Sequence, residues 1–177
     1  MEIIKKEEFV TTDWSGGTTT EVYISPKGAN VSERDFDYRV STATCELDES
    51  VFSDYSGFVR FIAPVDANLN LKNGDEEITL RPYEVYRFDG SDSVVGYSKV
   101  RDFNLIFKKG LSGKMYSTIV NGQARIENFS KKMLIFNNDS EIEVNNKDFE
   151  IFSAIVLDID EVVNFRGYGS LIICEMN

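Results

Sequence analysis

The sequence predicts an all-β protein built from two similar barrel units in one chain. Segments in which apolar and polar residues alternate recur along it, as in 68–73 (NLNLKN) and 141–146 (EIEVNN). Turn-forming clusters such as KNGDEE and NNDS separate these segments at about 8–12 residues, which is typical of sandwiches and barrels. Helical character is confined to 32–37 and 49–57, which could each hold a turn or two.

The same alternation predicts further strands. They cover 38–47, 85–88, 102–107, 116–120 and 170–176. Residues 59–80 also resemble residues 131–152 in the order of an apolar strand, a polar turn, an alternating strand, a charged turn and another apolar strand, with Asp75 and Asp148 in corresponding turns. We therefore expect a duplicated β-barrel that folds as one body over residues 1–177.

Composition excludes several classes of function. The net charge of −11, with no basic stripe, argues against binding to nucleic acid or to anionic membranes. The chain has no histidine, which removes imidazole acid–base catalysis, histidine-paired nucleophiles and histidine metal sites. The N-terminus is charged, without the apolar segment of a signal peptide, so we expect a cytoplasmic protein in which Cys45 and Cys174 are reduced, buried thiols.

Several predicted strands carry polar residues on a face that becomes apolar further along. These polar pairs are Arg39 and Ser41, Asp102 and Asn104, and Thr18 and Thr20. Such a change is expected for a strand that runs from the mouth of a barrel into its core. Arg60 lies on another strand, on an apolar face between Phe58 and Ile62.

The two arginines need anionic partners, because burying an unpaired guanidinium is very costly. Glu21, Asp102 or a ligand could supply the negative charge. One interpretation is an arginine–carboxylate pair that ties two strands together, or solvated residues at the rim. The other, compatible with it, is a pocket in which the planar guanidinium binds a small carboxylate.

The stretch 14–21 (WSGGTTTE) reads as a turn that enters a strand near this pocket. Gly16 and Gly17 would let backbone N–H groups approach a ligand closely. Trp14 would either cap the site or plug the end of the barrel. Glu21 lies on the opposite face from Thr20, which favours a structural pairing with an arginine. The stretch lacks the lysine and following helix of a P-loop, and no pair of carboxylates has a spacing that indicates a glycosidase.

Five segments carry a resemblance to a known family. In order, they are WSGGTTTE (14–21), FDYRVSTA (36–43), FSDYSGFVR (52–60), FDG (88–90) and DFNLIFKK (102–109). Together they resemble the HutD/Ves family. The chain departs from that family's usual pattern at Ser15, Thr20 and Tyr38, where asparagine, a basic residue and tryptophan are usual.

The resemblance implies a bicupin, with two cupin-type double-stranded β-helix or jelly-roll barrels at about 1–110 and 111–177 and an exchange of N-terminal strands left open. It implies a non-enzymatic protein that modulates histidine utilisation, or a related stress or catabolic response, by binding urocanate, a formylated amino acid or formate. Barrels of this type often pair, which favours a homodimer. The ligand-binding residues would be Trp14, Gly16, Gly17, Thr18, Thr20, Glu21, Arg39, Ser41, Phe52, Arg60, Asp102 and Asn104.

Many cupins hold a metal through histidines, so a chain without histidine is expected to have no such metal site, no cofactor and no metal-dependent dioxygenase, isomerase or germin-like chemistry. An all-oxygen Mg²⁺ or Ca²⁺ site stays open, although no EF-hand-like spacing is present. An alternative is a metal-independent isomerase, epimerase or lyase that acts on a small acid. Glu21 or Asp102 would be its base, and Tyr38 or Tyr55 its acid. A third interpretation is an interaction module in which 170–176 (SLIICEM) forms an interface instead of a core strand.

Overall fold

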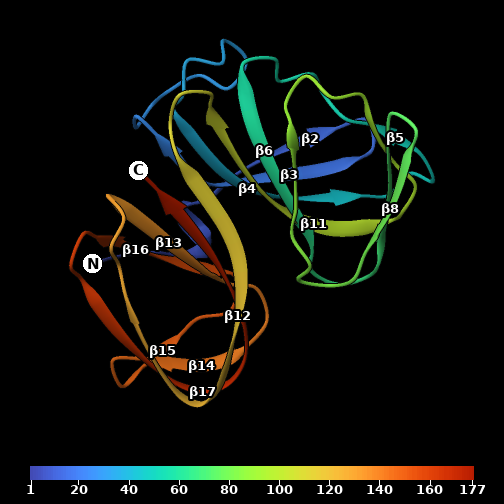
Figure 1. Ribbon diagram of the computed structural model, residues 1–177. Helices are drawn as coiled ribbons and strands as arrows, with labels where there is room; N and C mark the ends of the chain where they lie inside the picture. Colours follow the sequence, from blue (N-terminus) through green and yellow to red (C-terminus); the bar gives the residue numbers. More distant parts are fainter. The chain divides into compact units, whose positions relative to one another are not determined.

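The protein is built almost entirely of β-strands (Figure 1), as seen in a computed structural model that describes residues 1–177. Its one helix is a single 3₁₀ turn, η1 (Lys6–Glu8). The all-β prediction is therefore confirmed. The segments 32–37 and 49–57 contain turns and the short strand β5 instead of helix. No helix in the structure combines the length and apolar character needed to cross a bilayer.

The chain forms two compact units. The first unit is continuous and comprises Val10–Leu111. The second unit comprises Ser112–Asn177 together with the N-terminal segment Met1–Phe9. The N-terminal residues therefore belong to the same unit as the C-terminal third of the chain.

The first unit contains two antiparallel sheets. The six-stranded sheet has the order β2 (Val10–Trp14), β3 (Gly17–Ser25), β4 (Tyr38–Cys45), β11 (Val100–Lys108), β6 (Phe58–Pro64) and β9 (Tyr86–Asp89). The four-stranded sheet has the order β5 (Ser50–Val51), β10 (Val94–Gly96), β7 (Leu69–Asn73) and β8 (Glu76–Leu80). A buried cluster that includes Ile62 and Val100 from the larger sheet and Leu69 and Leu71 from the smaller one packs the two sheets together.

The alternation of β11 divides it into two different faces. Phe103 and Leu105 are fully buried and Phe107 is nearly so, as the wholly apolar face of this strand predicts. Burying side chains of this size contributes roughly 1.5–3 kcal/mol each. The opposite face carries Asp102 and Asn104, and the same packing fixes the direction in which these two polar side chains point.

The second unit is a seven-stranded antiparallel sheet. It runs β1 (Glu2–Ile4), β16 (Ser153–Asp158), β13 (Lys132–Asn137), β17 (Val162–Met176), β14 (Glu141–Val144) and β15 (Lys147–Phe149), with β12 (Gly113–Glu127) paired to β17. The long β12 and β17 strands lie side by side over their whole length (Figure 1). The segment 170–176 is the buried end of β17, which contributes Leu171 and Ile173 to the core of this unit.

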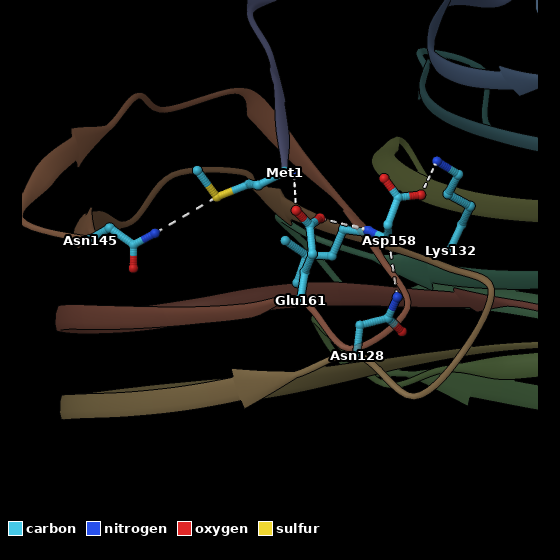
Figure 2. A network of polar contacts seen from close by, with 7 residues as sticks. Met1, Asn128, Lys132, Asn145, Asp158 and Glu161 are labelled. Atoms are coloured by element: carbon cyan, nitrogen blue, oxygen red, sulfur yellow. Dashed lines mark hydrogen bonds and ion pairs between the residues drawn. The ribbon is translucent and has the colours of Figure 1, made fainter.

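Polar contacts anchor the N-terminus in the second unit (Figure 2). The terminal amine of Met1 donates to Glu161, and Glu161 Oε2 accepts from the backbone N–H of Asp158 at 2.8 Å. Next to these contacts, β1 pairs with β16, placing Ile4 opposite Ala154. The ring of Phe9 packs against those of Phe136 and Phe152.

The internal resemblance corresponds to the same order of strands in both units. Residues 59–80 form β6, β7 and β8, and residues 131–152 form β13, β14 and β15. β7 pairs with β8, and β14 with β15. The equivalence of Asp75 and Asp148 is wrong: Asp75 lies in a turn, whereas Asp148 lies within β15 opposite Glu143.

Candidate functional site

A cavity of about 290 Å³ lies in the first unit and is lined from both of its sheets. β4, β6 and β11 supply the charged residues and the buried polar residues, and β2, β3, β5, β7 and β10 contribute to the rest of the wall together with loop residues. Among the predicted ligand-binding residues, those that line the cavity are Trp14, Arg39, Ser41, Phe52, Arg60, Asp102 and Asn104.

The polar residues Ser41 and Asp102 are buried, and on β4 this reverses the predicted direction of the strand. Ser41 is 3% exposed and Asp102 8%, whereas Ala43 and Cys45, further along β4, are only partly buried. Trp14 and Val51 line the cavity with 38% and 74% exposure, so they lie at its rim. The polar end of β4 is therefore the inner end, because it meets polar groups from β6 and β11 instead of solvent.

Arg39 forms the only ion pair in the cavity wall. Its Nε donates to Glu21 Oε2 at 3.0 Å, and both side chains are largely buried. Glu21 itself does not line the cavity. The pair ties β3 to β4 and balances one of the two cavity guanidinium charges, in the structural role that the sequence indicated for Glu21.

Arg60 is held in place but is not paired with a carboxylate. Its Nη1 donates to the carbonyl oxygen of Ser53 at 3.0 Å, and its guanidinium lies 4.9 to 5.3 Å from the ring centres of Phe52, Tyr55 and Phe88. Its Nε is buried and has no hydrogen-bond partner. Burial lowers the pKa of Arg60 to about 10, so the side chain remains a cation at neutral pH. Leaving a buried N–H unsatisfied is unfavourable. Arg60 itself lines the cavity and has no carboxylate partner, so its guanidinium is the candidate contact for an anionic ligand.

Asp102 is the second buried charged group that lacks an ion pair. The side-chain amide of Asn104 donates to its Oδ1, and no arginine or lysine lies within salt-bridge distance of it. Burial raises the pKa of Asp102 to about 7, and the Asn104 hydrogen bond and the charge of Arg60 lower it by less. The carboxyl group therefore changes its charge near neutral pH.

The glycine–threonine stretch serves mainly to pack the strands. Gly16, Gly17, Thr18 and Thr20 do not line the cavity. A Cβ on Gly16 would lie 2.3 Å from the Trp14 ring, and one on Gly17 would lie 2.1 Å from the carbonyl oxygen of Thr44. The two glycines therefore allow close packing against a ring and a neighbouring strand, and the predicted backbone contact with a ligand is not supported.

The face assignment along β3 is also wrong. Thr19, not Thr18 or Thr20, lines the cavity. Thr18 bonds to Thr44 and Thr20 to Thr11 through their hydroxyl groups. The register shifts between Glu21 and Tyr23, so a bulge interrupts the alternation that would have placed Thr20 and Ile24 on one face.

Other lining residues were not among the predicted ligand-binding set. They include Thr19, Cys45, Ser50, Ser53, Tyr55 and Ser98. The alternation of β4 placed Cys45 on the same face as Arg39, so that residue could have been included. Ser50, Ser53, Tyr55 and Ser98 reach the cavity through short strands and loops, which carry no periodic signal. Tyr38 packs its ring 5.7 Å from that of Phe107 and does not line the cavity.

A second hollow, of about 460 Å³, lies in the second unit. Its lining is mostly exposed asparagine, glutamine and arginine side chains, among them Arg125 and Arg166. Although it is larger, it contains no buried, unpaired charge. The first cavity is therefore the better candidate site. Nowhere does the structure gather three or more cysteine, aspartate or glutamate side chains that could hold a metal ion.

Comparison with known proteins identifies the family. The sequence model of HutD matches residues 6–168. The chain belongs to the HutD family. It matches no curated protein at the sequence level. The HutD match extends well beyond the motifs at 14–109 and into the second unit.

Solved structures show the fold that goes with this family. The chain resembles HutD from Pseudomonas fluorescens SBW25, solved in a formate condition, with 22% identity, a TM-score of 0.79 and coverage of 99% of this chain and 98% of that one. It resembles a conserved protein of unknown function from Pseudomonas aeruginosa PAO1 with 18% identity, a TM-score of 0.82 and the same coverage. A cupin barrel protein from Leptotrichia buccalis, at 9% identity and a TM-score of 0.59, covers 99% of this chain and 96% of its own. This HutD protein therefore has a cupin-like barrel fold.

Proposed function

We propose that this HutD protein is a cytoplasmic, metal-independent binding protein for a small carboxylate or formyl compound, and that it modulates histidine utilisation or a related catabolic or stress response. We further propose that its two units are both cupin barrels, a bicupin, and that the protein forms a homodimer. Urocanate, a formylated amino acid and formate are the candidate ligands. The observation that carries the proposal is Arg60, a buried guanidinium in the cavity wall that has no carboxylate partner.

The chemistry of the cavity supports a carboxylate ligand. Arg39 is balanced by Glu21, so Arg60 is the guanidinium whose charge is free to pair with an incoming anion. A guanidinium binds a carboxylate through directed, charge-assisted hydrogen bonds. Ser41 and Asn104 add polar groups that can orient the ligand, and Phe52, Ile62 and Leu69 offer an apolar wall. The volume limits the ligand to a compact molecule.

Thermal unfolding in the presence of each candidate acid tests the proposal. A ligand at 100 times its Kd adds about 2.7 kcal/mol of stability, which raises Tm by roughly 5–10 °C for a chain of this size. Arg60→Ala should weaken binding at least about tenfold, because it removes a charge-assisted hydrogen bond. Arg125→Ala, on an exposed arginine of the second unit, is the matched control and should leave binding unchanged. Equal shifts for Arg60→Ala and the wild type would rule out the carboxylate site.

A second candidate function is a metal-independent cupin enzyme, such as an isomerase, epimerase or lyase of a small acid. Asp102 favours it, since a carboxyl group whose pKa is about 7 can act as a general base at neutral pH. Tyr55 lies in the same wall and is the remaining candidate acid. Turnover of a bound acid that is lost in Asp102→Asn would establish this function, and unchanged ligand after prolonged incubation would favour the binding protein.

A further inference from the structure

The cavity contains two buried groups of opposite charge that do not pair with each other. Arg60 is 8% exposed, and its nearest polar contact is the carbonyl oxygen of Ser53. Asp102 is also 8% exposed and is bonded by Asn104. Neither belongs to an ion pair, although buried charges are usually paired.

The strand register explains why the two groups do not meet. Arg60 lies opposite Ile106 on β11, and Asp102 precedes Ile106 by four residues on the same strand. Four residues correspond to about 13 Å along a strand, and the Arg60 side chain spans only part of this distance. Its Nη1 donates to the carbonyl oxygen of Ser53, a residue that also lines the cavity. Both residues line the same cavity, and the charge of each shifts the pKa of the other although they form no ion pair.

The cavity wall thus carries a guanidinium cation and a carboxyl group that do not pair with each other. Burial penalises both charged forms, lowering the pKa of Arg60 and raising that of Asp102. A ligand that offered an anion to Arg60 and a hydrogen-bond donor to Asp102 would compensate both groups. A plain acid would compensate only Arg60 and would bring its negative charge towards Asp102.

We propose that Asp102 is a specificity-determining residue that selects a compact acid carrying an N–H donor at the end opposite its carboxylate. This inference rests on the proposed carboxylate site and narrows its ligand class. Among the three candidate ligands, urocanate carries such a donor on its ring and formate carries none, while in a formylated amino acid only one carbon separates the N–H from the α-carboxylate. Urocanate should therefore bind more tightly than formate.

A matched pair of probes tests the inference. Urocanate and 3-(3-furyl)acrylate have the same acrylate and similar five-membered rings, but the furan has no N–H. At about pH 8 the imidazole of urocanate is neutral and Asp102 is mostly ionised. The wild type should bind urocanate at least about tenfold more tightly than the furan, as measured by calorimetry, because only urocanate can donate a hydrogen bond to the buried, charged Asp102.

Two substitutions separate charge from hydrogen bonding. Asp102→Asn keeps a weaker, neutral acceptor and should reduce the preference to a few-fold. Asp102→Leu removes the acceptor and should leave the two probes within about twofold of each other. Asp148→Asn, on an exposed aspartate of the second unit, is the control and should keep the full preference. If Asp102→Leu does not fold, Asp102→Asn decides the outcome alone.

The outcomes distinguish the inference from the proposed function. Equal affinity of the wild type for both probes, or a preference that Asp102→Asn and Asp102→Leu retain, would overturn the role of Asp102 while leaving the carboxylate site intact. Affinity for both probes that Arg60→Ala does not change would overturn the carboxylate site and the inference with it. A preference that is present in the wild type and falls stepwise in the two Asp102 variants supports both.

Discussion

At the scale of single residues, burial makes Asp102 a source of pH-dependent stability even without a ligand. Its pKa is raised from an ordinary 3.8 to about 7. Between these values the folded protein holds a proton that the unfolded chain has released, so stability falls as pH rises through this window and levels off above it. Between about pH 5 and pH 8, the ionisation of Asp102 should lower the free energy of unfolding of the wild type by roughly 2–3 kcal/mol.

Urea unfolding of the wild type and of Asp102→Asn at about pH 5 and about pH 8 measures this loss of stability. The difference in free energy of unfolding between the two proteins should change by about 2–3 kcal/mol in favour of the variant at the higher pH. Asp158 and Glu161, whose pKa values are lowered, act with the opposite sign but are common to both proteins and cancel in the difference. Parallel pH profiles for the two proteins would show that Asp102 is ionised in both states.

At the scale of strands, the sequence was informative where alternation is unbroken. On β4 and β11 the period of two placed Arg39, Ser41, Asp102 and Asn104 correctly on the cavity face. On β3 the period of two grouped Thr18 with Thr20, but it could not show that Thr19 faces the cavity instead, and only the bulge after Glu21 brings Ile24 opposite the cavity residue Arg39. The direction of burial predicted along β4 was wrong, since burial depends on polar partners from other strands and not on the strand's own composition.

Residues supplied by loops could not be predicted from local pattern. Ser53 and Tyr55 reach Arg60 from the segment after β5, and only the folded arrangement brings them there. Residues 1–9 likewise belong to the second unit only through tertiary contacts, because β1 pairs with β16, which lies far away in the sequence. Long-range pairing of this kind leaves no signal in a short window.

The pairing of β1 predicts which part of the molecule depends on the N-terminal segment. Removal of residues 1–9 deletes β1 from the edge of β16 and the Phe9 ring from its contacts with Phe136 and Phe152. The second unit should lose at least about 2 kcal/mol through lost apolar burial and aromatic contacts. Hydrogen exchange should accelerate in β13 and β16 and remain unchanged in β4 and β11.

A point substitution within the same segment provides the control. Glu7→Ala alters an exposed side chain and should change stability by no more than about 0.5 kcal/mol. Equal acceleration of exchange in both units after the truncation would mean that the two units unfold together. Unchanged exchange in β16 would mean that its pairing with β1 contributes little stability.

At the scale of the whole molecule, the net charge of −11 opposes compactness at neutral pH. The ion pairs that resist this repulsion are mostly exposed, as for Lys5–Glu150 and Lys99–Asp48, and exposed pairs contribute little. Screening should therefore weaken the repulsion more than it weakens the favourable pairs. The protein is expected to become more stable as salt is added, unlike a protein in which attractive surface pairs dominate.

Thermal unfolding in NaCl tests this balance. Raising the ionic strength from about 0.01 M to about 0.15 M shortens the Debye length from ~30 Å to ~8 Å, and Tm should rise by roughly 2–4 °C, or about 1 kcal/mol. The internal control is the same comparison near the isoelectric point of about 4.5, where net repulsion vanishes and salt can only weaken attractive pairs. If the Arg60→Ala variant shows the same rise in Tm with salt at neutral pH, chloride bound to Arg60 in the cavity is not the cause of the stabilisation. A fall in Tm with salt at neutral pH would show that local ion pairs outweigh the repulsion among the excess carboxylates.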